Sequence, residues 1–212
     1  MELTLIQKIS VYALPVIFAI TVHEAAHGYV AKYFGDMTAY AQGRISFNPL
    51  RHIDPVGTIL VPLLTLLVGG ILFGWAKPVP VNFGKLRRPK QDMLWVAAAG
   101  PVSNLIMAIM WGLALKFSPA APEAISTPLS LMAQAGITIN VVLMVLNLLP
   151  LPPLDGGRIA VSLLPHRLAY QFSQVERYGF VILLVLMFTG ILGRILGPLI
   201  DATIGLLTWF LF

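Results

Sequence analysis

Long charge-free apolar runs, separated by short polar connections, dominate the chain. The runs cover residues 11–22, 55–76, 93–115, 124–154, 178–193 and 202–212. A membrane-spanning helix needs about 20 apolar residues, and the second, third and fourth runs reach that length outright. The first run reaches it only if its helix continues through His23, Glu24 and His27. The pattern predicts an all-α polytopic membrane protein with about 4–6 transmembrane helices.

The composition narrows the class of protein. Charged residues make up 11% of the 212 residues, against roughly 25% in soluble domains, and the mean hydropathy is +0.84. We therefore expect a lipid bilayer around the protein and no nucleic-acid partner. The absence of cysteine excludes disulfides and thiolate chemistry. The net charge of +5 indicates topology, because Lys and Arg concentrate on the cytoplasmic side of membrane proteins.

The residues His23-Glu24-Ala25-Ala26-His27 form an H-E-x-x-H motif. On a helix, side chains at positions i and i+4 lie on one face, so two imidazoles there can bind one zinc ion. The glutamate beside the first histidine can act as general base on water that the metal activates. Three ionisable residues inside an apolar segment are costly, and by default they indicate function.

Asp155 is the best candidate for the third ligand that a catalytic zinc site requires. It ends the 124–154 run, where prolines at 150, 152 and 153 cannot continue an α-helix. Such an opening at membrane depth is tolerated only where it is buried in protein or lines a polar cavity. Taken alone, these residues could equally be a helix end with a Gly-Gly turn and a snorkelling Arg158.

Five segments together resemble the site-2 protease family of intramembrane zinc metalloproteases. They are HEAAHG (23–28), GRISFNPLRHIDPVGT (43–58), AKPVPVN (76–82), AAAGPVSN (97–104) and NLLPLPPLDGGR (147–158). The resemblance implies one zinc ion per chain, with His23, His27 and Asp155 as ligands and Glu24 as general base. It also implies that Asn147 positions the substrate or steadies the oxyanion. The chain looks like a short form of the family, without a PDZ or CBS domain.

The resemblance implies a metalloendopeptidase that hydrolyses peptide bonds within or near the transmembrane segments of a membrane-protein substrate. The alternative is a catalytically silent, zinc-bearing membrane scaffold or chaperone of the same fold. Glu24 disfavours that alternative, because a pure binder needs ligands but no base. A metal transporter would need polar groups across the bilayer, which the charge-free runs do not offer. The sequence leaves the oligomeric state and the physiological substrate open.

We expect a single membrane-embedded metalloprotease domain over residues 1–212, with a catalytic core at about 8–158 and C-terminal helices at about 174–212. The two histidines and Asp155 all lie towards the C-terminal ends of their segments. Zinc bonds of about 2.0–2.2 Å therefore require these two segments to cross the membrane in the same direction. This condition predicts that residues 55–76 re-enter the membrane, with a full span as the alternative.

The re-entrant topology places most Lys and Arg on one face of the membrane. It predicts a multi-pass protein of the prokaryotic cell membrane, with an external N-terminus and a zinc site nearer the cytoplasmic side.

Residues 44–47 and 78–81 have the pattern of a short strand and an extended edge segment, and they predict a membrane-associated β-hairpin after the first helix. Such an edge could hold an unwound substrate by strand addition, whereas an ordinary loop is the alternative. Asn104 is expected to make an interhelical hydrogen bond that steadies the core. His52 and Asp54 are interpreted as loop and turn residues.

Overall fold

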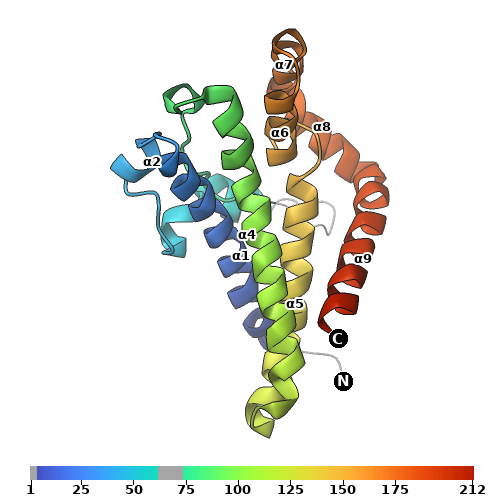
Figure 1. The fold of residues 1–212 in the computed structure, drawn as a ribbon. Coiled ribbons are helices and arrows are strands. Elements are labelled where there is room, and N and C mark those ends of the chain that lie inside the picture. The colour runs from blue at the N-terminus through green and yellow to red at the C-terminus, as the bar shows by residue number, and fades with distance from the viewer. Residues whose placement is uncertain (1–3, 62–73) are drawn as a thin grey trace.

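The computed structural model describes residues 4–61 and 74–212, and these residues contain helices and loops but no strand (Figure 1). The four long helices are α1 (Leu5–Tyr33), α4 (Pro89–Phe117), α5 (Glu123–Asn147) and α9 (Ile191–Leu211). The shorter α-helices are α2 (Thr38–Ala41), α6 (Asp155–Leu163), α7 (His166–Ser173) and α8 (Glu176–Phe188). The remaining short helical segments are η1 (Pro49–His52), η2 (Pro55–Leu60), η3 (Phe83–Lys85) and η4 (Ser118–Ala120). The prediction of an all-α protein is confirmed for the described residues.

Within residues 4–61 and 74–212, four helices are long and apolar enough to cross a membrane, which agrees with the lower end of the predicted number. These spans are Ile9–Tyr33, Pro89–Ala120, Glu123–Asn147 and Ile191–Leu211. The protein is therefore a multi-pass membrane protein.

The two C-terminal helices have different boundaries from the apolar runs 178–193 and 202–212. The run 178–193 becomes the short helix α8, and the spanning helix is α9, which includes Arg194 and Asp201. Gly190 lies between the two helices in the left-handed conformation, with a φ of 73°, and so separates α8 from α9. The two charged side chains are exposed on α9 and leave its hydrogen bonds intact. Glycine geometry, and not charge, thus decides where the helix begins.

Helices α1, α4 and α5 pack on one another and form the core (Figure 1). Helices α1 and α5 run in the same direction and α4 runs in the opposite one, as convergence of the predicted ligands requires. Small side chains make this close packing possible: Ala19, Ala25, Ala108 and Ala133 are almost completely buried. The histidine-bearing end of α1 is therefore held beside the end of α5 that leads to Asp155.

Helix α9 is tied to the core at its C-terminal end. Lys116, near the end of α4, donates through Nζ to the carbonyl of Leu211 at 2.6 Å. A cation satisfies an orphan carbonyl at a helix C-terminus and complements its partial negative charge. Leu211 also packs over Gly112, where a Cβ atom would overlap its side chain.

The predicted β-hairpin is not found among the described residues. Residues near 44–47 and 78–81 are extended loops, and a side chain joins them: Arg44 Nη2 donates to the carbonyls of Lys77 and Pro78 at 3.0 and 3.2 Å. Pro78 and Pro80 lack the N–H groups that a strand ladder needs, and the N–H of Val79 is bonded elsewhere. The proline spacing that suggested an extended segment also prevents it from pairing as a strand.

The predicted re-entrant segment lies largely outside the described residues, because it includes residues 62–73. Its flanks are described. Trp75 N donates to the carbonyl of Gly57 at 2.9 Å, and the Thr58 hydroxyl donates to the carbonyl of Trp75 at 3.0 Å. The backbone at residues 57 and 58 therefore lies beside the backbone at residue 75.

Candidate metal centre

His23, His27 and Asp155 converge at the meeting point of α1 and the N-terminus of α6. Their ligand atoms all lie within 4.8 Å of one another. The Nε2 atoms of the two histidines are 3.1 Å apart, and each lies 3.3 Å from Asp155 Oδ2. Two residues of one helix and one residue more than a hundred positions away thus form the predicted three-ligand set.

Hydrogen bonds fix the orientation of both imidazole rings. His27 Nδ1 lies 2.7 Å from the carbonyl of Val96, which can only accept, so Nδ1 carries the proton. His23 Nδ1 lies 2.6 Å from Asn104 Oδ1. With Nδ1 protonated, each neutral ring presents the lone pair of Nε2 to the centre of the cluster. This arrangement is typical of metal-binding histidines, whose second nitrogen donates to an oxygen.

Asn104 is held in this role by two further helices. Its Nδ2 donates to Asn140 Oδ1 on α5 at 2.9 Å and to the carbonyl of Ala19 on α1 at 3.3 Å. Asn140 Nδ2 in turn donates to the carbonyl of Gly136 at 2.8 Å. Both asparagines are completely buried. Because each amide nitrogen has an acceptor, Asn104 Oδ1 must face His23, and the predicted interhelical hydrogen bond is confirmed.

The chemistry of the cluster fits a zinc ion. A tetrahedral site with bonds of about 2.0–2.1 Å has ligand–ligand edges of about 3.3–3.4 Å, close to the 3.1–3.3 Å between these atoms. Asp155 Oδ2 is buried and has no hydrogen-bond partner among the described residues. Three acceptor atoms that face one another in a buried site repel unless a cation lies between them.

The loop between α5 and α6 delivers Asp155 to the histidines. The prolines at 150, 152 and 153 end α5, as predicted, and α6 begins at Asp155 itself. Gly156 and Gly157 then pack directly on the loop backbone, where a Cβ atom would overlap Leu148 and Pro152. The glycine pair that follows the aspartate is therefore needed for the close turn that positions it.

Gly100 on α4 provides the floor of the cluster. A Cβ atom at this position would lie 2.5 Å from His23 Cε1 and 2.5 Å from His27 Nε2. The two imidazoles therefore pack directly on the α4 backbone. Segment 97–104 is rich in small residues, which allow close helix packing, but the sequence did not indicate that the two imidazoles are the groups that pack there.

Glu24 lies beside the cluster on α1 and is half-buried. Its Oε2 accepts a hydrogen bond from the backbone N–H of Val79 at 2.7 Å. Val79 belongs to residues 76–81, which we call the strap, and its side chain also packs over Gly28. The strap thus fixes one oxygen of the carboxylate, and no hydrogen bond to Oε1 occurs within the described part of the chain.

Asn147 is not brought into the cluster by any described contact. It is the last residue of α5, and its Nδ2 donates to the carbonyl of Leu143 at 3.0 Å. His52 and Asp54 have structural roles, as predicted. His52 is buried and bonds to the carbonyl of Ser46 at 2.8 Å, and Asp54 caps η2 through Oδ1.

Sequence reasoning missed Asn140 and Val79. Asn140 could have been noticed as an asparagine in the middle of an apolar segment, where an amide needs a partner. Val79 could not, because its contribution is a backbone N–H.

Comparison with known proteins gives one family. Residues 113–190 match the model described as Peptidase family M50. The chain is 44% identical over 190 residues to "Putative zinc metalloprotease YwhC" of Bacillus subtilis (strain 168), covering 88% of this chain and 84% of that protein. It is 30% identical over 181 residues to "Putative zinc metalloprotease Rip2" of Mycolicibacterium smegmatis, covering 84% and 66% of the two chains.

A third relative, "Putative zinc metalloprotease Rip2" of Mycobacterium tuberculosis (strain H37Rv), is 29% identical over 173 residues, covering 79% of this chain and 62% of that protein. No solved structure matches the chain significantly. The family model covers Asn147 and Asp155, and the relatives' names agree with the donor set that the geometry brings together. The chain belongs to peptidase family M50, the site-2 protease family, and zinc is its metal.

Proposed function

We propose that the protein is an intramembrane zinc metalloendopeptidase that hydrolyses peptide bonds within or near transmembrane segments of other membrane proteins. The observation that carries this proposal is the buried triangle of His23, His27 and Asp155 with Glu24 beside it. Glu24 favours a hydrolase over a zinc-bearing scaffold, because a scaffold needs ligands but no base. We propose one zinc ion per chain and a catalytic core at about residues 8–158, which includes every one of these side chains.

The residues divide the work of peptide hydrolysis. His23, His27 and Asp155 would hold the zinc ion, which would act as a Lewis acid on water and on the scissile carbonyl. Glu24 accepts a proton from the water as its oxygen bonds to the carbonyl carbon. When the C–N bond breaks, the same carboxyl group gives that proton to the leaving amine. The bond from Val79 holds Oε2, which leaves Oε1 as the proton acceptor.

We further propose that Asn147 positions the substrate or hydrogen-bonds the developing oxyanion. Its amide must first leave the carbonyl of Leu143, and this exchange costs about 0.5–1.5 kcal/mol, the net value of one hydrogen bond. A substrate carbonyl offers the same amide an alternative acceptor. The role therefore requires that the Asn147 amide exchange its bond to Leu143 for one to the substrate.

Cleavage of a model transmembrane substrate by the purified protein in lipid tests the proposed activity. We expect cleavage that a zinc chelator abolishes and added zinc restores. Glu24→Gln should keep the metal and lose about 10²–10⁴-fold in rate, the contribution of a general base. Measuring the zinc content of each sample shows whether lost activity reflects the missing base or missing zinc. Cleavage that survives Glu24→Gln would contradict the proposed base, and no cleavage of a diverse substrate panel would favour the scaffold.

We propose that the cell membrane holds the protein with its zinc site nearer the cytoplasmic side. The support is the excess of Lys and Arg near that end of α1 and α4. Because the chain has no cysteine, single substitutions report cleanly on sidedness. We expect Ser46→Cys and Lys85→Cys to be labelled from the same side, and Glu123→Cys, at the other end of the bundle, from the opposite side. Labelling of the first two from opposite sides would contradict a re-entrant segment 55–76.

A further inference from the structure

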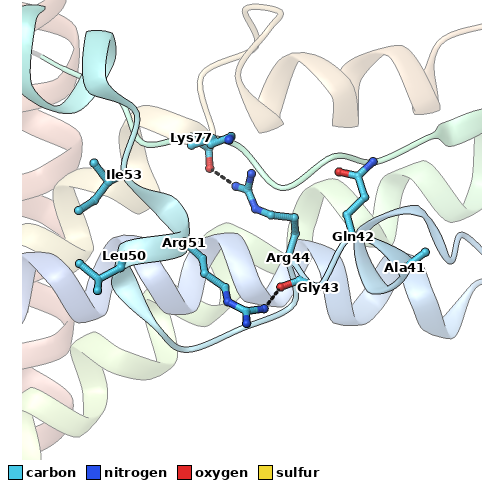
Figure 2. Close-up of a pocket in the computed structure, with 8 residues that line it drawn as sticks. All are labelled: Ala41, Gln42, Gly43, Arg44, Leu50, Arg51, Ile53 and Lys77. Carbon is cyan, nitrogen blue, oxygen red and sulfur yellow. Dashed lines mark hydrogen bonds between the residues drawn. The ribbon is translucent and has the colours of Figure 1, made fainter.

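A basic pocket lies on the loops between α2 and η2, outside the metal centre (Figure 2). It is open and has a volume of about 580 Å³. The lining residues are Ala41, Gln42, Gly43, Arg44, Leu50, Arg51, Ile53 and Lys77. Three of these residues are cationic and none is acidic. We call this site the basic pocket.

The three cations receive no counter-charge from the described residues. No ion pair in the described part of the chain includes Arg44, Arg51 or Lys77. Their hydrogen bonds go to neutral carbonyls: Arg44 donates to Lys77 and Pro78, and Arg51 donates to Gly43. Arg44 Nε is buried and has no hydrogen-bond partner among the described residues. An anion is therefore the ligand whose charge the pocket lacks.

The apolar part of the wall indicates what carries the anion. Leu50 is 72% exposed and Ile53 is 39% exposed. Figure 2 shows both side chains together on one side of the basic pocket, with Arg44 and Arg51 between them and Gln42. A soluble anion gains nothing from such a wall. An amphiphile with a charged head and a hydrocarbon chain uses both parts.

We propose that the basic pocket binds the phosphate of an anionic phospholipid at the membrane surface. The guanidinium groups of Arg44 and Arg51 and the ammonium of Lys77 receive the phosphate, and Leu50 and Ile53 face the start of the acyl chains. Basic pockets of membrane proteins bind lipid head groups in this way on the leaflet that is rich in anionic lipid. Binding of the lipid at this site requires neither zinc nor the protease reaction.

The basic pocket also adjoins the strap. Arg44 donates hydrogen bonds to the carbonyls of Lys77 and Pro78, and the backbone N–H of the next residue, Val79, donates to Glu24. A lipid phosphate bound to Arg44 would therefore act on the segment that orients the proposed base.

Lipid retention by the full chain tests the proposal. The Glu24→Gln protein is purified in mixed micelles of phosphatidylglycerol and phosphatidylcholine, and native mass spectrometry counts the lipids of each kind that stay bound. We expect preferential retention of phosphatidylglycerol. Lys77→Gln and Arg51→Gln should each weaken it about five-fold, the effect of one basic residue at an anionic membrane surface. Arg167→Gln on α7 is the matched control, because it removes the same charge outside the pocket.

Each alternative result overturns the proposal in a recognisable way. Equal retention of the two lipids would exclude a site for an anionic head group. An equal loss in Arg167→Gln would mean that attraction by the whole basic surface, and not this pocket, retains the lipid. Displacement of phosphatidylglycerol by inorganic phosphate at similar concentration would show that the ligand is a soluble anion. Lys77→Gln is the decisive variant, because its side chain makes no described hydrogen bond and its loss should not disturb folding.

Discussion

Asp36 and Asp155 are both buried carboxylates at the same end of the helix bundle, yet their surroundings differ. Asp36 Oδ1 accepts hydrogen bonds from the backbone N–H and the hydroxyl of Thr38 at 3.0 and 2.5 Å, and Oδ2 accepts from Asn82 N at 2.6 Å. Asp155 Oδ2 has two imidazole nitrogens 3.3 Å away and no hydrogen-bond donor among the described residues.

The difference distinguishes a carboxylate that stabilises the fold, Asp36, from one that is available to bind a metal ion, Asp155. A buried charge that protein donors fully satisfy connects chain segments, and Asp36 connects the end of α1 to residue 82. A buried charge that faces only lone pairs requires a cation. Burial alone would not have distinguished the two residues. Their hydrogen-bond partners do distinguish them.

Asp155→Asn should have the largest effect on metal binding. The substitution keeps the shape of the side chain, removes its charge and replaces one oxygen by a donor nitrogen. Loss of a residue that supports a ligand without touching the metal lowers metal affinity by up to about 100-fold. We expect the loss of a ligand itself to lower zinc affinity by more than this. Metal content after dialysis against a graded series of chelators measures the loss. Retention of zinc at the affinity of the unchanged protein would exclude Asp155 as a ligand.

Gly100→Ala should displace the two histidines that we propose as ligands without substituting either of them. The new Cβ would lie 2.5 Å from atoms of both His23 and His27, so the rings or α4 must shift. Overpacking of this kind costs about 1–3 kcal/mol, and we expect zinc binding and cleavage to fall together.

Gly193→Ala on α9 is the control for Gly100→Ala, because no atom lies within 4 Å of the added Cβ. It should leave zinc binding unchanged. If Gly100→Ala behaved like this control, the imidazoles would not pack on α4 as described.

Asn104→Ala should have an intermediate effect on zinc. It removes the acceptor of His23 Nδ1–H, so the ring loses its fixed orientation. We expect zinc affinity to fall about 10–100-fold. The absorption spectrum of the cobalt-substituted protein should also change, because ligand geometry sets the spectrum. Asn140→Ala, one step further from the ring, should lower affinity less. An unchanged spectrum in Asn104→Ala would limit this residue to helix packing.

Asp36→Asn should have the smallest effect on zinc and a moderate effect on stability. The new amide nitrogen would face the N–H of Asn82 and leave that donor unsatisfied, which costs about 1–3 kcal/mol. Thermal unfolding in detergent micelles should show a lower midpoint with unchanged zinc content. Glu123→Gln, at an exposed carboxylate, provides the control. Loss of zinc from Asp36→Asn would break the distinction between the two carboxylates.

The stabilisation by Asp36 should also depend on pH. Burial alone would raise the pKa of this carboxyl, but the hydrogen bonds from Thr38 and Asn82 hold the pKa below its ordinary value. A pKa that is lower in the folded state gives stability that is fully present above the unfolded value of about 3.9. That stability is lost as pH falls through the folded pKa. Asp36→Asn should remove this acidic dependence from the unfolding midpoint.

The sequence alone determined the class of the protein and predicted which residues bind the metal. Apolar runs long enough to span a bilayer can only be helices, because backbone groups in lipid must be satisfied within one segment. The i, i+4 spacing of His23 and His27 follows from helix geometry and needs no tertiary information. Asp155 became the candidate for the third ligand because the three prolines cannot continue the helix that precedes it.

Only the tertiary structure decided how these residues become a site. The Nε2 lone pairs face one another because Val96 and Asn104, on a different helix, accept from Nδ1. The strap donates a hydrogen bond to Glu24 and does not pair as a strand, because its prolines lack the N–H groups that strand pairing needs. These outcomes depend on backbone atoms and contacts between distant segments, which leave no mark in local hydrophobic periodicity. The order of residues therefore predicted the zinc ligands, and packing around Gly100 and Asn104 fixed the directions in which these side chains point.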